Sequence, residues 1–244
     1  MLYIIHHSAY LITSRLHYLD VTRGFAIVLM VIYHFSFDLD NFNYIQIDMD
    51  HSQFWRSFRA VIVTLFLTTM GMSLALTHAK GICWSCMRKR TLFLGGASIL
   101  VSVGSYLQFP ESWIYFGILH FILFASWLGL LFVGKPWLSL VTAIVVLAGY
   151  LTGWLHTRGL YELVHQPLHL PVRYTEDMVN MFPWFAPVLM GIFIVAKGWH
   201  LLPHLNPSFI STKLSFMGRY SLIIYLIHQP ILFGVTLLAN KAGL

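Results

Sequence analysis

The stretch LDVTRGFAIVLMVIYHFSFDLD, residues 19–40, determines the fold class of this chain. Its apolar centre is about as long as the ~20 residues that a helix needs to cross a bilayer. Only helices and closed barrels satisfy the whole backbone in lipid, and this run is too long and continuous for a barrel strand. The stretch therefore predicts a membrane-spanning helix, in which the polar residues Asp20, His34 and Asp38 need an explanation.

The rest of the chain repeats this pattern. Hydrophobic residues make up 58% of it and charged residues 10%, whereas a soluble domain carries roughly 25% charge. We expect an all-α, polytopic transmembrane helical bundle of about seven spans, or eight if residues 1–14 form another. Those residues are an apolar segment whose order the sequence leaves open, and 15–240 form a single domain. The expected spans are 21–39, 57–77, 91–108, 113–134, 137–155, 183–200 and 215–238.

Lys and Arg predict the orientation of the bundle. Seven spans sort the loops into two alternating sets, one with ten of the 15 basic residues and the other with five. Because cytoplasmic loops carry the basic excess, the richer set is expected inside. The N-terminus is then cytoplasmic and the C-terminus periplasmic or extracellular. The same rule accounts for the net charge of +6, so we expect no nucleic acid partner.

Five ionisable residues fall within or at the edge of apolar segments, and this topology puts all of them on the outer side. Burying such groups in lipid is costly, so they usually face a bundle interior or an aqueous path. Three of them are histidines at similar depth, and histidine acts as acid, base or proton relay near neutral pH. We expect them to share an outward-facing cavity. The five residues are His34, Asp38, His120, Asp177 and His228.

The first span gathers its polar residues on one face. At 100° per residue, Asp20, Arg23, His34 and Asp38 lie within about 60° of one another. The two aspartates are roughly 27 Å apart along the helix, close to the hydrocarbon thickness. Residues four apart can meet, so Asp38 could orient His34 and raise its basicity.

The last span has a second polar face. Tyr225 and His228 recur on it at helical spacing, and Pro230 should kink the helix and free a carbonyl beside His228. That carbonyl and its polar neighbours could help to stabilise an oxyanion. We expect an acceptor substrate to contact Asp177, Trp184, Tyr225 and Gln229. Close helix packing is expected at Gly71, Gly95, Gly96, Gly104 and Gly117.

A single CxxC occurs in GICWSCMRKR, residues 81–90. A zinc site needs four ligands, and without a second pair no metal site is expected. A redox dithiol stays open, although no thioredoxin-like βαβ pattern surrounds it. The basic residues that follow signal a cytoplasmic loop, or they hold the phosphates of a cytoplasmic ligand. They are Arg88, Lys89 and Arg90.

Five motifs together resemble one family. The chain is similar, from Arg15 nearly to its end, to short bacterial members of the heparan-alpha-glucosaminide N-acetyltransferase catalytic-domain family. The last motif is also similar to the wider group of integral-membrane acyltransferases. The motifs are RLHYLDVTRGFAIVLMVIYHFSFDL, LFLTTMGMSLAL, GILHFI, EDMVNMFPWFAPVLMG and FMGRYSLIIYLIHQPIL.

The resemblance implies transfer of an acetyl or other acyl group from cytoplasmic acyl-CoA to a glycan-type amine or hydroxyl across a bacterial inner membrane. In the animal enzyme the active histidine follows the first span and precedes a tryptophan, and His51 in HSQFW is its nearest counterpart. His34 is our candidate base, while His51, His120 or His228 could relay protons or carry the acyl group briefly. Acyl-CoA would contact Arg23, Arg88, Lys89 and Arg90.

Two other functions remain open from the residues alone. The histidines with Asp38 could relay protons in a transporter, although no repeated halves or paired broken helices occur. They could also lock helices together in a non-catalytic bundle. Membrane lipid surrounds the protein in all three cases.

Overall fold

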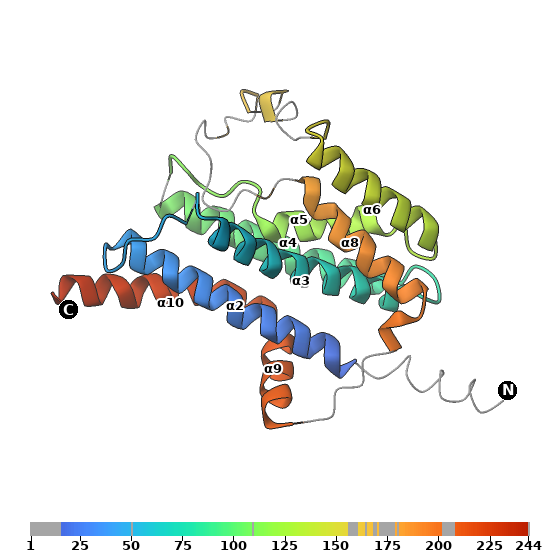
Figure 1. Cartoon of the computed structure of the whole chain (residues 1–244), viewed down its shortest axis with the longest axis horizontal. Coiled ribbons are helices and arrows are strands. Elements are labelled where there is room, and N and C mark those ends of the chain that lie inside the picture. Colours follow the sequence, from blue (N-terminus) through green and yellow to red (C-terminus); the bar gives the residue numbers. More distant parts are fainter. Residues whose placement is uncertain are drawn as a thin grey trace. The chain divides into compact units, whose positions relative to one another are not determined.

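The computed structural model describes residues 16–49, 51–108, 110–155, 161–163, 165–167, 170, 179, 181–201 and 208–243. Over these ranges the longer elements are all helices (Figure 1). They are α2 (His17–Asn41), α3 (Gln53–Thr77), α4 (Trp84–Gln108), α5 (Ile118–Gly129), α6 (Pro136–Leu151), α8 (Met181–Ala196), the short 3₁₀ turn η1 (Trp199–Leu201), α9 (Phe209–Arg219) and α10 (Ser221–Lys241).

The all-α membrane fold is confirmed. Within the described ranges, α2, α3, α4 and α10 are long and apolar enough to cross a membrane. Three helices, α5, α6 and α8, are apolar but shorter. Each of the seven predicted segments contains a helix, and the number of spans stays a prediction.

The predicted segment 113–134 is wrong at its start, because α5 begins only at Ile118. Residues before it form a loop whose backbone is satisfied by serine side chains of α4. The Ile114 N–H donates to Ser105 Oγ at 2.9 Å, and Ser102 Oγ donates to the Ile114 carbonyl at 2.7 Å. These bonds replace the helical ones that hydropathy alone would predict.

The predicted segment 215–238 is also wrong, since it is two helices that meet at Tyr220 (φ −101°, ψ 20°). The first of them, α9, packs closely against the start of α2. A Cβ at Gly24 would overlap the Leu214 carbonyl, and one at Gly218 would overlap the Asp20 carbonyl. Backbones this close require glycine. The two glycines allow α9 to cross α2 closely before α10 begins.

The chain divides into two compact units, the first ending at Phe66 and resuming at Leu201. In this first unit α10 runs beside the second half of α2 in the same direction (Figure 1). Both helices therefore present their later residues at one end. A buried cluster of Ile27, Met30 and Ile62 lies in the same unit.

The second unit, Leu67–His200, packs α8 against the later part of α3. A Cβ at Gly71 would overlap the Val188 carbonyl, so close packing is confirmed there. It is wrong at Gly96 and Gly104, where a Cβ would meet nothing within 4 Å among the described atoms.

Candidate functional site

Two side chains of α2 contact two side chains of α10. The rings of His34 and His228 lie edge to face with their centroids 5.0 Å apart. One turn further along α2, Asp38 Oδ1 accepts a hydrogen bond of 2.9 Å from Gln229 Nε2. Asp38 is fully buried and His228 is 8% exposed. The structure thus unites four of the residues that the sequence singled out.

The hydrogen bond of His228 fixes which ring nitrogen carries the proton. Its Nδ1 lies 2.6 Å from the carbonyl oxygen of Tyr225, so Nδ1–H must donate and a neutral ring leaves Nε2 with a free lone pair. That Nε2 is buried and has no hydrogen-bond partner among the described residues. A buried, unprotonated imidazole nitrogen is what a general base requires.

Two more buried acceptors occur in the same contact region. Asp38 Oδ2 and Gln229 Oε1 are buried, and neither has a hydrogen-bond donor within the described part of the chain. Leaving a buried acceptor unsatisfied costs about 1–3 kcal/mol, and native proteins keep few of them. With His228 Nε2 they make three acceptors suited to a ligand that brings hydrogen-bond donors, such as an amine or a hydroxyl.

Aromatic rings surround the histidine pair. Tyr33 lies edge-on to His34 with ring centroids 5.7 Å apart, and Trp55 of α3 packs against Tyr33 at 5.9 Å. Tyr225 contacts His228 from the α10 side, at 5.6 Å. The histidine pair thus has aromatic neighbours from both α2 and α10.

Asp38 was predicted to contact His34, but in the structure each of the two residues contacts a residue of α10. The Asp38 carboxyl group accepts a hydrogen bond from Gln229, and the ring of His34 contacts that of His228. Sequence reasoning placed all four residues in the site but missed this pairing. Knowing which residues share the polar face of one helix does not tell which residues of a distant helix they contact.

His51 lies in an exposed loop. Its side chain is 86% exposed, and its Nδ1 and backbone N–H both lie 2.9 Å from Asp48 Oδ1. The carboxylate thereby closes a local turn just before α3. A catalytic role for His51 stays a prediction.

His120, in the second unit, has a partner on each ring nitrogen. The Gly117 N–H donates to Nδ1 at 3.2 Å. Ser102 Oγ lies 3.1 Å from Nε2, and since Ser102 already donates to a carbonyl, the Nε2–H donates to it. The ring therefore ties α5 to α4 and to the intervening loop. Whether His120 shares a cavity with the other histidines stays a prediction.

The residues proposed for acyl-CoA differ in their surroundings. Arg23 lies 3.5 Å from the buried Asp20, which also has Arg219 at 3.5 Å. Arg88 and Lys89 are exposed in the first turns of α4, and Arg90 is half-buried. The exposed pair is free to meet phosphates.

The predicted acceptor contacts Trp184 and Asp177 lie at or before the start of α8 in the chain. Trp184 is half-buried near the start of α8, and Asp177 falls outside the described residues. Among the described side chains, no group of three or more His, Cys, Asp or Glu could hold a metal ion.

The fold and the contact between the half-buried His34 and the buried His228 define an integral-membrane helical protein with polar residues held between two of its long helices. A family model described as heparan-alpha-glucosaminide N-acetyltransferase, catalytic, matches residues 15–230. The chain therefore belongs to this family, which implies an acetyltransferase-type membrane protein. Searches of curated proteins and of solved structures gave no match.

Proposed function

We propose that the chain transfers an acetyl or other acyl group from cytoplasmic acyl-CoA to an amine or hydroxyl of a glycan-type acceptor at the outer face. The observation that carries the proposal is the buried Nε2 of His228, which has no hydrogen-bond partner in the part of the chain that the structure describes. The family match supports the acetyl group and the acyl-CoA donor.

In the proposed reaction His228 is the general base. Its Nε2 removes a proton from the acceptor while the acceptor nitrogen or oxygen attacks the thioester carbonyl carbon. The C–S bond breaks, CoA leaves as a thiolate, and the proton on Nε2 passes to the leaving sulfur. A well-placed base of this kind contributes roughly 10²–10⁴-fold to the rate.

The neighbours of His228 have proposed roles that follow from their contacts. Asp38 Oδ2 and Gln229 Oε1 would accept hydrogen bonds from the acceptor, which fixes its orientation. The Tyr225 carbonyl holds the His228 ring in the tautomer that a base needs. His34, in ring contact with His228, would hold the ring of that base in place.

The outer residues and the basic cluster complete the proposal. Acceptor contacts at Tyr225, Trp184 and Asp177 are proposed from their expected outer position. Arg88 and Lys89 are exposed cations that suit the phosphates of CoA, with Arg23 and Arg90 as further contacts. This requires the cytoplasmic N-terminus and inner-membrane location that the charge distribution predicts.

The test is acetyl transfer by purified protein from radiolabelled acetyl-CoA to amino sugars. Wild type is compared with His228→Gln, Asp38→Asn and a control, Gln53→Ala, which alters an exposed side chain. We expect transfer by wild type and the control, loss in His228→Gln and a smaller loss in Asp38→Asn. Turnover by His228→Gln at the wild-type rate would refute the assigned base.

A proton-coupled transporter is the second candidate, because the two imidazoles in edge-to-face contact are groups that can also carry protons. Reconstituted liposomes separate the two functions. Acceptor-driven proton flux without thioester consumption would establish transport and overturn the acyltransferase proposal.

A further inference from the structure

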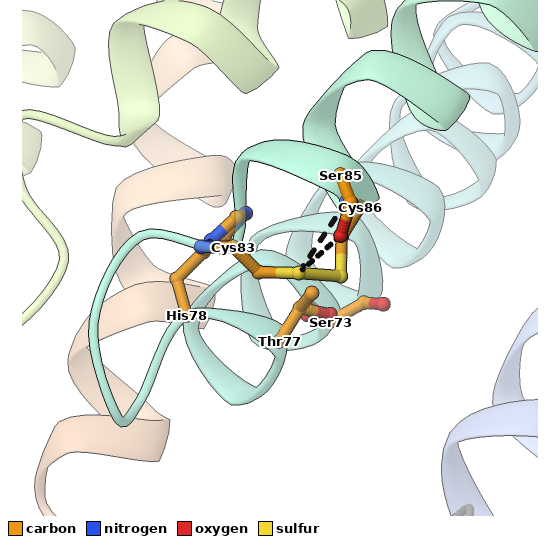
Figure 2. The surroundings of a disulfide bond; sticks show 6 residues. All are labelled: Ser73, Thr77, His78, Cys83, Ser85 and Cys86. Atoms are coloured by element: carbon orange, nitrogen blue, oxygen red, sulfur yellow. Dashed lines mark hydrogen bonds between the residues drawn. A yellow bond between two sulfur atoms is a disulfide. The ribbon is translucent and has the colours of Figure 1, made fainter.

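We propose that Cys83 and Cys86 form a thiol–disulfide exchange site, with Cys83 as the attacking sulfur. The two cysteines are joined by a disulfide at the start of α4 (Figure 2). The acyl-transfer proposal makes no use of them, and they lie in the second unit. The inference therefore concerns a separate activity.

Cys83 occupies the N-cap position of α4. Its carbonyl accepts the first helical hydrogen bond, from the Met87 N–H at 3.0 Å. Its sulfur lies 3.3 Å from the Cys86 N–H, the backbone donor that an N-cap side chain ordinarily satisfies. The sulfur thus points at the positive end of a 25-residue helix, where a thiolate is stabilised more than a thiol.

Further groups near the sulfur favour its ionised form. Ser85 Oγ lies 3.4 Å from Cys83 Sγ and can donate to it (Figure 2). The exposed cations Arg88 and Lys89 follow in the next turn. Cys86 lies inside the first turn of the helix and not at its N-terminal end. This asymmetry assigns Cys83 as nucleophile and Cys86 as the resolving thiol.

His78 positions the reactive loop. The Cys83 N–H donates to His78 Nδ1 at 3.0 Å, which ties the N-cap residue to the end of α3. His78 itself is buried, so the loop that carries Cys83 is anchored on the protein. The two cysteines are half-buried and their neighbours Trp84 and Ser85 are exposed, which leaves a path for a partner.

An external dithiol can reduce the Cys83–Cys86 disulfide, and an external disulfide can oxidise the reduced pair. The reduced Cys83 thiolate attacks one sulfur of an external disulfide, breaks its S–S bond and releases one thiolate. Cys86 then loses its proton and attacks Cys83 Sγ. This closes the internal disulfide and releases the second external thiol, so two electrons and the Cys86 proton pass to the partner.

The predicted topology gives the exchange a setting. It places this loop in the cytoplasm, where disulfides in proteins are usually transient and catalytic or redox-sensing. The test below uses purified protein, so its result does not depend on the orientation or on acyl transfer.

The experiment measures reaction of the reduced, folded full-length protein with an aromatic disulfide whose released thiolate absorbs light. We expect Cys86→Ser to react at Cys83 and stop at a trapped mixed disulfide. We expect Cys83→Ser to react about tenfold more slowly. Wild type should release two aromatic thiolates and recover its internal disulfide, which mass spectrometry detects.

Two further variants test the surroundings. Removal of the acceptor in His78→Ala should slow exchange and alter its pH profile, and His78→Asn, which keeps an acceptor, should restore the rate. Ser73→Ala is the control, since Ser73 lies near the pair but no hydrogen bond joins its side chain to either sulfur (Figure 2). Faster reaction at Cys86, or a disulfide that a dithiol reduces only after unfolding, would overturn the proposal.

Discussion

His228 and His120 both sit in apolar helices, yet their surroundings are opposite. His120 has hydrogen-bond partners on both ring nitrogens. His228 uses one nitrogen on the Tyr225 carbonyl, and the other is buried without a hydrogen-bond partner among the described residues. The comparison separates a histidine whose bonds the protein completes from one that awaits a ligand.

The difference arises from the neighbouring residues. α4 provides two serines one turn apart, and the loop before α5 supplies backbone groups, so both ring nitrogens of His120 and the Ile114 backbone find partners. α2 faces α10 with a carboxyl group and a second imidazole. The Gln229 amide donates to Asp38 Oδ1, but Asp38 Oδ2, Gln229 Oε1 and His228 Nε2 are acceptors without a donor among the described residues. Acceptors cannot satisfy one another, so these three atoms suit a ligand that brings donors.

The largest expected effect comes from His228→Gln. Glutamine can keep a hydrogen bond to the Tyr225 carbonyl but cannot act as a base. We expect acetyl transfer to fall by roughly 10²–10⁴-fold with little change in the thermal unfolding temperature. A parallel fall in both quantities would instead mean that His228 is a structural residue like His120, and the comparison would fail.

The next effect concerns the helix crossing in the unit of His34 and His228. Gly218→Leu should destabilise the protein by about 1–3 kcal/mol, because even a Cβ at this position overlaps the Asp20 carbonyl. Gly104→Leu is the matched control, with nothing within 4 Å among the described atoms. Thermal unfolding in detergent measures both. Equal unfolding temperatures for the two variants would contradict the close crossing of α9 and α2.

A smaller effect on transfer is expected for His120→Ala. The change leaves the buried Gly117 N–H without its acceptor, which costs about 1–3 kcal/mol, while the half-buried Ser102 Oγ keeps its bond to the Ile114 carbonyl. We expect a lower unfolding temperature, with transfer per folded molecule reduced far less than in His228→Gln. A selective loss of transfer at unchanged stability would give His120 a catalytic role after all.

Much of the fold could be predicted from hydropathy alone. The run 21–39 predicted α2 to within a few residues, since burial in lipid leaves the backbone no alternative to a helix. The break at Tyr220 was missed because α9 turns to cross α2 at Gly24 and Gly218. Such a crossing depends on tertiary contacts, and periodicity does not encode it.

The candidate site was predicted in its members but not in its pairings. The cost of burying ionisable groups was enough to single out His34, Asp38 and His228. Spacing along α2 suggested that Asp38 meets His34, whereas the carboxyl group bonds to Gln229, 191 positions away. Helical spacing describes only contacts within one helix. A contact between two helices depends on how each helix is rotated about its own axis. The spacing of residues in one sequence does not give that rotation.

The smallest expected effect concerns His78, a third histidine, which lies outside the spanning segments. Burial, and then the charge of Arg90, lower the pKa of His78 below its ordinary value of 6.5. The unfolded chain then binds the proton more readily, so the stability contributed by neutral His78 is present above pH 6.5 and is lost as the pH falls below it. Unlike His228, its Nδ1 already accepts a backbone N–H, and protonation must break that bond.

The unfolding temperature of wild type should therefore fall between neutral pH and about pH 5 more steeply than that of His78→Asn, which cannot titrate. Asparagine keeps an acceptor for the Cys83 N–H, so the two proteins should differ in slope and only slightly at neutral pH. Identical slopes would mean that the proton enters without disturbing the loop. The bond to Cys83 would then not depend on a neutral ring, and His78 would lose its assignment as a histidine whose bonds the fold completes.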